Sequence, residues 1–432
     1  MSARTARSVF GLCCWALLGF SACVIKLSDK NAPLPNGGVT GPAADCTQLT
    51  PLPPGGPGTG DAKEKFVGRY ELEDPGRARF DWSGNYVSAR FEGTEVSVGI
   101  EAPVPMVFTA VIDGQEPIKF LVDATRSSYL VASGLPAGVH EVTVHRDSEP
   151  LFGACAFTGF NFGAGKILPP TERPRRIEYI GDSITCGYGN EGINATCPYD
   201  VPADPSNPNG DRVPITENQY LAYGSIAARA LFADAVTLCY SGKGVYQNYR
   251  EGQIGEGAAA GPANAKPDPD AKTVVPQYYE RTLASEPNSP KWDFTKEPEP
   301  QVVVINLGTN DFTRDVDQDS NADGIDLAKF QQAYYDFVGV VRQRRPNAHI
   351  FLLLPPMVTD KFPLDEARSD FRNVLNQIVS TRNQNGDGKV YFAELVEMGV
   401  RYGLGCDYHP NLEVHRIMAD QIIGAIRSKT CW

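Results

Sequence analysis

Hydrophobic and polar positions alternate in short segments over residues 63–165. Residues 86–91 and 140–145 place apolar side chains at about every second position, as half-buried strands do. Another such segment ends at Asp113-Gly114, a pair that favours a tight hairpin turn. No segment with helical periodicity interrupts this region. The pattern therefore predicts a small all-β domain over residues 63–168, a β-sandwich of the jelly-roll type.

The pattern changes after Pro169-Pro170, where continuous apolar runs alternate with segments of helical periodicity. The apolar runs cover residues 177–180, 235–240, 302–307, 350–354 and 390–395. Strands that are almost entirely apolar, with helices between them, indicate a parallel sheet that is covered on both faces. We therefore predict a doubly wound α/β domain with three layers, α/β/α, over residues 169–432.

The first 62 residues precede both domains. Residues 1–23 combine a basic start, an apolar run and small residues before Cys23, which is the layout of an export signal and is too short to span a bilayer. Residues 20–23 are similar to a bacterial lipoprotein cleavage box, with Phe20 where Leu is usual. We expect a lipid anchor at Cys23, with plain secretion as the alternative. Residues 24–62 are rich in Pro and Gly and predict a linker.

Export permits disulfide bonds, and seven of the 10 cysteines follow Cys23. Because seven is odd, at least one cysteine stays free or pairs outside the chain. The sequence does not determine the connectivity. Cys239 lies in an apolar run and is our expected buried thiol, while a bridge between Cys186 and Cys197 is one candidate.

Composition and charge narrow the classes of function. Hydrophobic residues make up 42% of the 432 residues, which is enough for a sizeable core. The formal net charge of −12 argues against a nucleic-acid partner, which needs a basic surface. The 5 histidines include no pair at the helical spacing of a zinc site. Residues 383–394 are spaced like a calcium loop, but a Gly-rich turn is the better interpretation. We expect no metal and no cofactor.

Polar residues with acyl-transfer chemistry follow the apolar runs of the C-terminal half. Carboxyl ends of parallel strands meet at one edge of a sheet, so these segments are expected to converge. A hydroxyl nucleophile, a Gly-rich backbone, an amide donor and an imidazole are the set that acyl transfer requires. The segments are Gly181-Asp182-Ser183, Ser241-Gly242-Lys243-Gly244, Gly308-Thr309-Asn310-Asp311 and, before the last helix, Asp407-Tyr408-His409.

In this order, the four segments resemble the SGNH (GDSL-type) hydrolase superfamily. Together with the β-rich front domain, residues 175–185 and residues 405–410 are similar to carbohydrate esterase family two. The resemblance covers about residues 63–432. It implies a jelly roll joined to an SGNH hydrolase domain, and a serine esterase that removes O-acetyl groups from plant polysaccharides such as xylan or glucomannan. The expected partner is therefore an acetylated polysaccharide, with membrane contact only through the lipid anchor.

The resemblance and the chemistry assign the same roles. Ser183 is the expected nucleophile, and His409 is the base that accepts its proton and later returns it to the departing alcohol. The expected oxyanion hole consists of the backbone N–H groups of Ser183 and Gly242 and the side-chain amide of Asn310. Gly244 could replace Gly242; we favour Gly242 because it is the first glycine after its strand.

Asp407 and Tyr408 have less definite roles. Asp407 lies two residues before His409, whereas SGNH enzymes generally place the acid three residues before the histidine. In the resembling family some members orient the histidine through a backbone carbonyl, as a dyad. We expect Asp407 to orient His409, with a purely structural carboxylate as the alternative. We expect Tyr408 to stack on a sugar ring, with a packed tyrosine as the alternative.

Two other functions stay open at this point. One is a non-catalytic carbohydrate-binding surface protein, although the intact Ser183, Asn310 and His409 argue against it. The other keeps the esterase but directs it to peptidoglycan O-acetyl groups or to short acyl lipids. Comparing acetyl with longer esters would separate the last of these, because a small acyl pocket rejects extra methylenes. The sequence does not determine the glycan or the oligomeric state.

Overall fold

The computed structural model describes residues 39–40, 56–58, 60–74, 76–249, 272–315, 322–399 and 402–432. The predicted export signal with Cys23 lies outside these residues, and so does most of the predicted linker. Within the described ranges, no helix combines the length and the apolar character needed to cross a bilayer.

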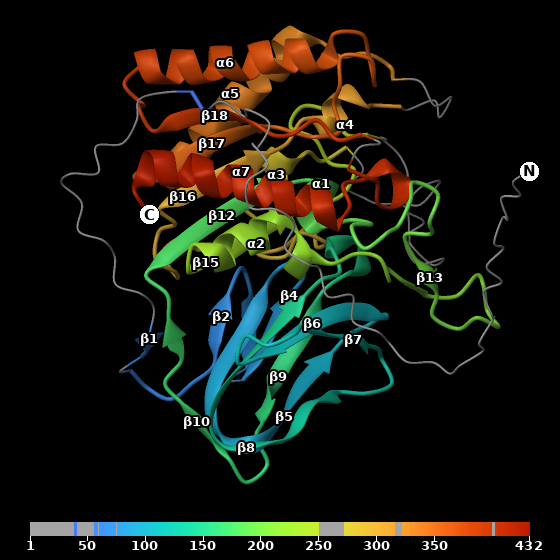
Figure 1. Ribbon diagram of the computed structural model, residues 1–432, viewed down its shortest axis with the longest axis vertical. Helices are drawn as coiled ribbons and strands as arrows, with labels where there is room; N and C mark the ends of the chain where they lie inside the picture. The colour runs from blue at the N-terminus through green and yellow to red at the C-terminus, as the bar shows by residue number, and fades with distance from the viewer. Residues whose placement is uncertain are drawn as a thin grey trace, which may run out of the picture. The chain divides into compact units, whose positions relative to one another are not determined.

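The N-terminal part of the described chain is an all-β domain (Figure 1, blue to teal). Its strands form one 9-stranded sheet in which every neighbouring pair is antiparallel. The predicted all-β domain is therefore confirmed. The strands are β2 (Lys65–Val67), β3 (Glu71–Asp74), β4 (Arg77–Phe80), β5 (Tyr86–Glu101), β6 (Met106–Ile112), β7 (Ile118–Val122), β8 (Ser128–Arg146), β9 (Cys155–Asn161) and β10 (Lys166–Leu168), with the 3-10 helix η2 (Pro150–Phe152) between β8 and β9.

Alternation of side chains builds the core of this domain. In β4, Ala78 and Phe80 are buried, while the two arginines of the strand are partly exposed. Val142 and Val144 on β8 are buried in the same way and join one apolar cluster with Phe80. Apolar residues at every second position therefore face the core, as a strand with one buried face requires. A short pair, β1 (Gly56–Pro57) and β11 (Thr171–Glu172), lies outside this sheet.

The C-terminal part is an α/β domain built on a 5-stranded sheet of order β15-β12-β16-β17-β18. All four pairings are parallel, so the predicted doubly wound α/β fold is confirmed. Its strands are β12 (Arg175–Gly181), β15 (Ala233–Cys239), β16 (Val302–Asn306), β17 (His349–Leu354) and β18 (Val390–Glu394). Its long helices are α2 (Tyr223–Ala230), α5 (Leu327–Arg344), α6 (Ala367–Gln384) and α7 (Leu412–Thr430). Shorter elements are α1 (Ser183–Cys186), β13 (Val201–Pro202), β14 (Arg212–Val213), η3 (Gln219–Leu221), α3 (Val275–Tyr278), α4 (Thr309–Phe312) and η4 (Cys406–Tyr408).

Helices cover both faces of the parallel sheet. Val303 and Ile305 of β16 pack in one cluster with buried residues of α5 and α6. Val302 and Val304 of the same strand belong to a second cluster, with residues of α2 and α7. Successive residues of a strand point to opposite faces, so an entirely apolar strand is the signature of this three-layer arrangement.

Buried polar contacts join the two domains, which lie against each other in Figure 1. The indole N–H of Trp82 donates to the backbone O of Thr282 at 3.0 Å. Arg69 is fully buried, donates to the backbone O of Arg281 at 2.8 Å and lies 3.7 Å from the carboxylate of Glu178. Glu178 in turn accepts two hydrogen bonds from Arg345, both at 2.9 Å. The domains therefore share a desolvated, hydrogen-bonded boundary.

Candidate active site

The candidate nucleophile lies where the order of the strands reverses. Counted along the chain, the strands of the parallel sheet run 2-1-3-4-5, so the switch point falls between β12 and β16. Ser183 is the first residue of α1, which Asp182 alone separates from β12, and Asn310 lies in α4 just after β16. The side chain of Asp182 caps α1 by accepting from the N–H of Ile184 at 3.1 Å. Open sheets bind ligands at such a crevice, so the fold places both side chains at the expected edge.

Ser183 and His409 are in direct contact. The Oγ of Ser183 lies 2.8 Å from Nε2 of His409, although 226 residues separate them in sequence. On the other side of the ring, Nδ1 lies 2.9 Å from the backbone O of Asp407. Because a carbonyl oxygen can only accept, Nδ1 carries the proton and Nε2 is free to accept from the serine hydroxyl.

The carboxylate of Asp407 does not take the place that we expected for it. It accepts a hydrogen bond from the hydroxyl of Tyr188 at 2.7 Å, while the backbone O of the same residue orients His409. Burial and the charge of Asp200 raise the pKa of this carboxyl, and the bond from Tyr188 opposes the rise. Positive φ angles of 49° at Asp407 and 60° at Tyr408 shape this turn. The main-chain carbonyl of Asp407 therefore orients His409, and the side chain of Asp407, which we expected in that role, does not.

Burial prepares His409 to act as a base. Desolvation lowers its pKa from 6.5 to about 4, and the hydrogen bond to the backbone carbonyl of Asp407 opposes this effect only in part. Low dielectric surroundings disfavour the charged imidazolium, which explains the direction. The ring is therefore neutral near pH 7 and can accept a proton from Ser183.

The structure distinguishes the two glycines between which the sequence left a choice. The N–H of Gly244 donates to the side chain of Asn248 at 3.1 Å, and a Cβ on Gly244 would lie 2.0 Å from the backbone O of Gln247. Gly242 has φ +75°, and a Cβ there would meet no atom within 4 Å. Gly244 is thus packed into its loop, whereas Gly242 borders open space. This favours Gly242 as the residue whose N–H faces a ligand.

Asn310 lies against the same loop. Its Nδ2 donates to the backbone O of Lys243 at 2.9 Å, and a primary amide carries a second hydrogen. The neighbouring Asp311 holds the loop from below, because its carboxylate accepts from the backbone N–H groups of Val245, Tyr246 and Gln247. Three donors from consecutive residues keep that segment rigid. The structure therefore brings the Gly242 loop and Asn310 together.

Tyr408 is 64% exposed, so the packed alternative is wrong. It directly precedes His409 in the sequence. Sequence reasoning expects the polar insertion over residues 186–218, which contains Tyr188 and Tyr199, to shape the cleft, but it does not indicate that these rings stack beside His409. The ring of Tyr188 lies 4.4 Å from that of His409, and Tyr199 stacks on Tyr188 at 3.8 Å. No local sequence pattern signals this stack, because its members come together only through the loop after α1.

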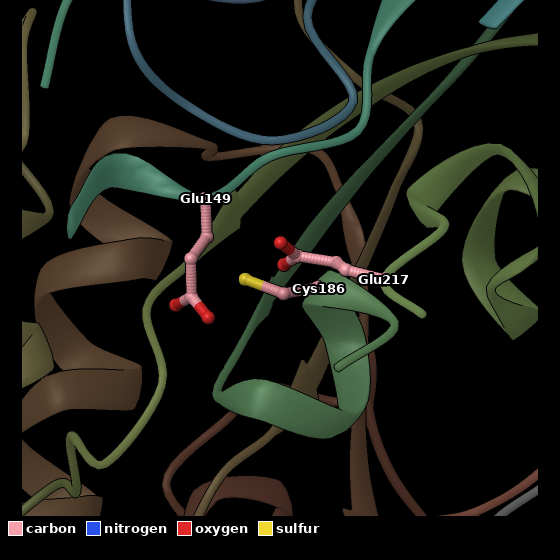
Figure 2. A group of neighbouring side chains, drawn as sticks. All are labelled: Glu149, Cys186 and Glu217. Carbon is pink, nitrogen blue, oxygen red and sulfur yellow. The ribbon is translucent and has the colours of Figure 1, made fainter. Parts of the chain in front are cut away.

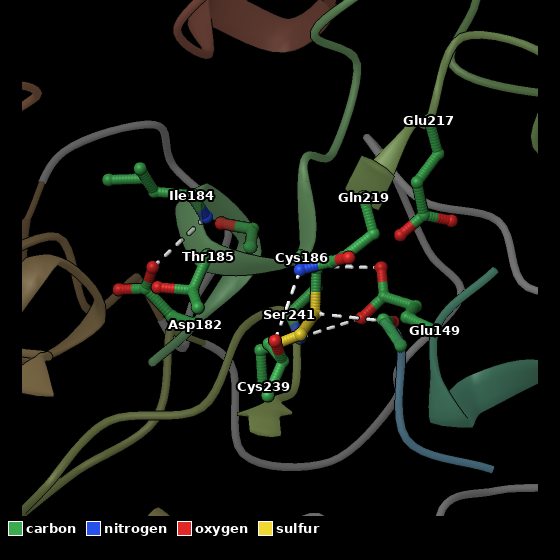
Figure 3. Close-up of a disulfide and its surroundings, with 12 residues drawn as sticks. Glu149, Asp182, Ile184, Thr185, Cys186, Glu217, Gln219, Cys239 and Ser241 are labelled. Carbon is green, nitrogen blue, oxygen red and sulfur yellow. Dashed lines mark hydrogen bonds between the residues drawn. A yellow bond between two sulfur atoms is a disulfide. The ribbon is translucent and has the colours of Figure 1, made fainter. Parts of the chain in front are cut away.

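Three potential metal ligands gather at the C-terminal end of α1. Figure 2 shows Cys186 between the carboxylates of Glu149 and Glu217, and their ligand atoms lie within 4.8 Å of one another. The sulfur of Cys186 is bonded to Cys239, as Figure 3 shows, so it offers no thiolate. The hydroxyl of Tyr199 lies 2.9 Å from Glu217 and 3.4 Å from Glu149, so its single hydrogen goes to the nearer carboxylate, that of Glu217. The cluster is therefore a hydrogen-bonded acid pair beside a disulfide.

The disulfides differ from the pairing suggested above. Cys186 is bonded to Cys239, and Cys197 to Cys406, while Cys155 is the free buried cysteine of the described residues. Cys239 is the last residue of β15, which pairs with β12, and its Cα lies 5.5 Å from that of Cys186. The expected free thiol and the expected 186–197 bridge were therefore wrong, because proximity in sequence did not decide proximity in space. The second bridge ties the loop after α1 to η4, next to His409.

Comparisons with known proteins agree with this architecture. The model of the carbohydrate esterase 2 N-terminal domain matches residues 66–171, and that of the GDSL-like lipase/acylhydrolases matches residues 177–422. The chain is similar to a family two carbohydrate esterase from Clostridium thermocellum, solved in complex with cellohexaose. The sequence identity is 35%, the match covers 84% of this chain and 98% of that one, and the TM-score is 0.70.

Two further relatives are similar along most of this chain. The cellulase/esterase CelE of Acetivibrio thermocellus is 36% identical over 368 residues, which is 85% of this chain but only 39% of CelE. This chain thus spans well under half the length of that relative. An acetylxylan esterase / glucomannan deacetylase of Cellvibrio japonicus is 24% identical over 90% of this chain and 93% of its own length.

Proposed function

The chain belongs to carbohydrate esterase family two, and on that premise we propose that it is a serine esterase that removes O-acetyl groups from polysaccharides of the xylan or glucomannan type. The observation that carries this proposal is the 2.8 Å contact between the Oγ of Ser183 and Nε2 of a neutral His409. The names of the relatives, which include acetylxylan esterase / glucomannan deacetylase, support the substrate class.

The first half-reaction forms an acetyl-enzyme. The Oγ of Ser183 attacks the acetyl carbonyl carbon while its proton passes to Nε2 of His409. The carbonyl oxygen becomes an oxyanion, which the backbone N–H groups of Ser183 and Gly242 and the amide of Asn310 stabilise. Each such donor is typically worth about 3 to 4 kcal/mol in the transition state. The carbon–oxygen bond to the sugar then breaks, and Nε2 gives its proton to the departing hydroxyl oxygen.

The second half-reaction restores the enzyme. Water attacks the acetyl carbon as Nε2 of His409 takes one of its protons, and the same donors hold the second oxyanion. Collapse breaks the bond to the Oγ of Ser183, which recovers the proton and releases acetate. Throughout, the backbone O of Asp407 holds Nδ1–H, so the site works as a dyad with a main-chain orienter.

The exposed ring of Tyr408 supports a sugar substrate. Aromatic rings present an apolar face on which a pyranose can stack, and this ring lies one residue from His409 with 64% of its surface exposed. We assign Tyr408 to binding of the sugar that carries the acetyl group. Loss of the ring should then raise KM for acetylated polysaccharide and leave small chromogenic esters unaffected.

We also propose that the protein is exported and anchored to the bacterial envelope through Cys23, or else secreted. The layout of residues 1–23 and the Pro- and Gly-rich linker support this. The disulfides Cys186–Cys239 and Cys197–Cys406 are further support, because such bonds persist in oxidising compartments outside the cytosol. Labelling with a radioactive fatty acid, compared between wild type and Cys23→Ala, tests the anchor.

The experiment that tests the activity compares wild type with Ser183→Ala and His409→Ala on a chromogenic acetate ester. Each variant should lose at least about a thousandfold in kcat, since nucleophile and base act as one unit. Equal inactivity of wild type and variants would instead favour the non-catalytic carbohydrate-binding protein. Acetate release from acetylated xylan, glucomannan and peptidoglycan, measured side by side, then identifies the glycan. Faster cleavage of butyryl and longer esters would point to short acyl lipids.

A further inference from the structure

A carboxylate from the all-β domain holds the loop of the candidate oxyanion hole. Glu149 accepts from the backbone N–H of Ser241 through Oε2 and from the hydroxyl of the same serine through Oε1, both at 2.7 Å. Figure 3 shows these two bonds beside the Cys186–Cys239 disulfide. Ser241 directly precedes Gly242. The fully buried side chain of Glu149, from the all-β domain, thus holds the residue that precedes Gly242 in the α/β domain.

Both partners of this contact are anchored. Arg146, also fully buried, donates to the backbone O atoms of Ser148 at 2.7 Å and of Glu149 at 3.1 Å, which fixes the segment that carries the carboxylate. On the other side, Ser241 follows the end of β15, where Cys239 is bonded to Cys186 of the helix that begins with Ser183. The bonds of Glu149 and the disulfide therefore both restrict the distance between Ser183 and the loop that contains Gly242.

The stability of the fold does not explain this carboxylate. Among the described residues, its hydrogen-bond partners are Ser241 and Tyr199, and none is a Lys or Arg side chain. Burial raises the pKa of Glu149 to about 7, against the opposing effect of the bonds from Ser241. The charge of Arg146 favours the ionised carboxyl, but no cation donates a hydrogen bond to it, so its burial is costly and an apolar residue of similar size would pack without that cost. What the carboxylate supplies is two directional bonds to one residue.

We propose that Glu149 is a positioning residue, which orients the Ser241–Gly242 peptide so that the N–H of Gly242 points at the oxyanion. This inference rests on the proposed esterase function and deepens it. Rotation of that peptide requires a change of the backbone at Ser241, which both bonds to Glu149 resist. The all-β domain is thus part of the catalytic apparatus and not only a substrate platform.

The same carboxylate also reaches the histidine side of the site. Its Oε1 lies 3.4 Å from the hydroxyl of Tyr199, whose ring stacks on Tyr188, and Tyr188 packs against His409. This second path is longer and consists of packing contacts. Removal of Glu149 should therefore affect the loop that contains Gly242 before it affects His409.

The test is a comparison of kcat and KM for Glu149→Gln and Glu149→Ala on a chromogenic acetate ester. An oxyanion donor acts only in the transition state, so its displacement lowers kcat and leaves KM nearly unchanged. Loss of one such donor typically costs 10²- to 10³-fold in kcat, and a misplaced donor should cost about 10- to 100-fold in the Ala variant. Gln keeps an acceptor for the N–H of Ser241, so its loss of kcat should be smaller than that of Ala but still at least about threefold.

A matched control breaks another bond between the two domains. The hydroxyl of Tyr86 donates to Asp234 at 2.7 Å, near the start of β15 and so at the opposite end of that strand from Ser241. Tyr86→Phe should lower Tm and leave kcat unchanged. If Glu149→Ala does not fold, Glu149→Gln and Ser241→Ala, which removes only the hydroxyl bond, carry the test and should each lower kcat.

Two results would overturn the inference. One is wild-type kcat in the folded Glu149 variants. The other is an equal loss of kcat in Tyr86→Phe at a similar drop in Tm, which would show a general effect of loosened domains. Failure of the proposed function looks different, because wild type itself would then hydrolyse no ester.

Discussion

The candidate base, His409, is held by a neutral main-chain oxygen. A carbonyl fixes the ring and its tautomer, as the 2.9 Å contact to Nδ1 of His409 shows, but it carries no full charge with which to stabilise the imidazolium. The missing negative charge and the burial of the ring both favour the neutral base.

Substitution of Asp407 should affect the reaction far less than substitution of His409. Asp407→Asn keeps an acceptor for the hydroxyl of Tyr188 and tolerates the positive φ, so kcat should fall less than about tenfold. His409→Ala removes the base and should cost at least about a thousandfold. Steady-state kinetics on a chromogenic acetate measure both. Equal losses in kcat would show that the carboxylate, and not the carbonyl, completes the site.

The pH profile should extend well into the acid range. Protonated Nε2 cannot accept the proton of Ser183, so activity is lost as pH falls through the pKa of His409, which burial lowers to about 4. We expect kcat/KM to keep most of its value down to about pH 5 and to be lost below that, with only a partial decline near pH 7 as Glu149, whose pKa burial raises to about 7, takes up a proton. Circular dichroism at each pH checks that the protein remains folded. An acid limb centred at the ordinary imidazole value of about 6.5 contradicts this account.

The loop after α1 and the turn η4 form one element of the site. The disulfide Cys197–Cys406 joins them, and the N–H of Cys406 donates to the backbone O of Gly189 at 3.0 Å. The N–H of Asp407 donates to the backbone O of Ala195, also at 3.0 Å. These bonds hold two consecutive residues other than glycine at positive φ, a conformation that costs roughly 1 to 2 kcal/mol per residue.

Removal of this disulfide should therefore reach the active site. In the double variant with Cys197→Ser and Cys406→Ser, the free energy of unfolding should fall by about 2 to 5 kcal/mol. The turn that carries Asp407 should relax, and kcat should fall by about tenfold as the ring of His409 loses its fixed direction. Urea titration and kinetics at a temperature where the variant is folded measure the two effects. Unchanged kcat would show that hydrogen bonds alone hold η4.

The buried contacts between the two domains determine whether the domains unfold separately or together. Arg69 of the all-β domain and Arg345 of the α/β domain share the carboxylate of Glu178, and the three side chains are almost fully buried. Such a group is sensitive to the loss of its central charge, because two buried guanidinium groups would then lose the carboxylate that they share and keep the weaker effect of Glu297. The domains should therefore unfold together.

Glu178→Ala should lower the free energy of unfolding by about 3 to 5 kcal/mol, the usual cost of breaking a buried ion pair. Urea denaturation followed by tryptophan fluorescence measures it and should show one transition. Lys166→Ala is the control, because it removes an exposed ion pair with Glu92 and should cost less than about 1 kcal/mol. Similar losses in both variants would argue against the buried cluster as the link between the domains.

Periodicity along the chain predicted the elements and the edge of the sheet at which the site forms. Alternate burial in β4 and continuous burial in β16 follow directly from residue patterns, because each strand exposes or buries its faces by local geometry. The reversal of strand order then places Ser183 and Asn310 at neighbouring strand ends. Both residues could be identified before any coordinates, because strand ends are encoded locally.

Only the tertiary structure decided which atoms meet at that edge. The backbone O of Asp407 faces His409 because two residues other than glycine adopt positive φ, and neither residue type signals this conformation. The partners of Cys186 and Cys197 lie 53 and 209 residues away, and Glu149 reaches Ser241 from another domain. Contacts of this kind depend on how loops bring together residues that are far apart in the sequence. Residue patterns indicate which face of an element is buried, but they do not indicate which other elements lie beside it.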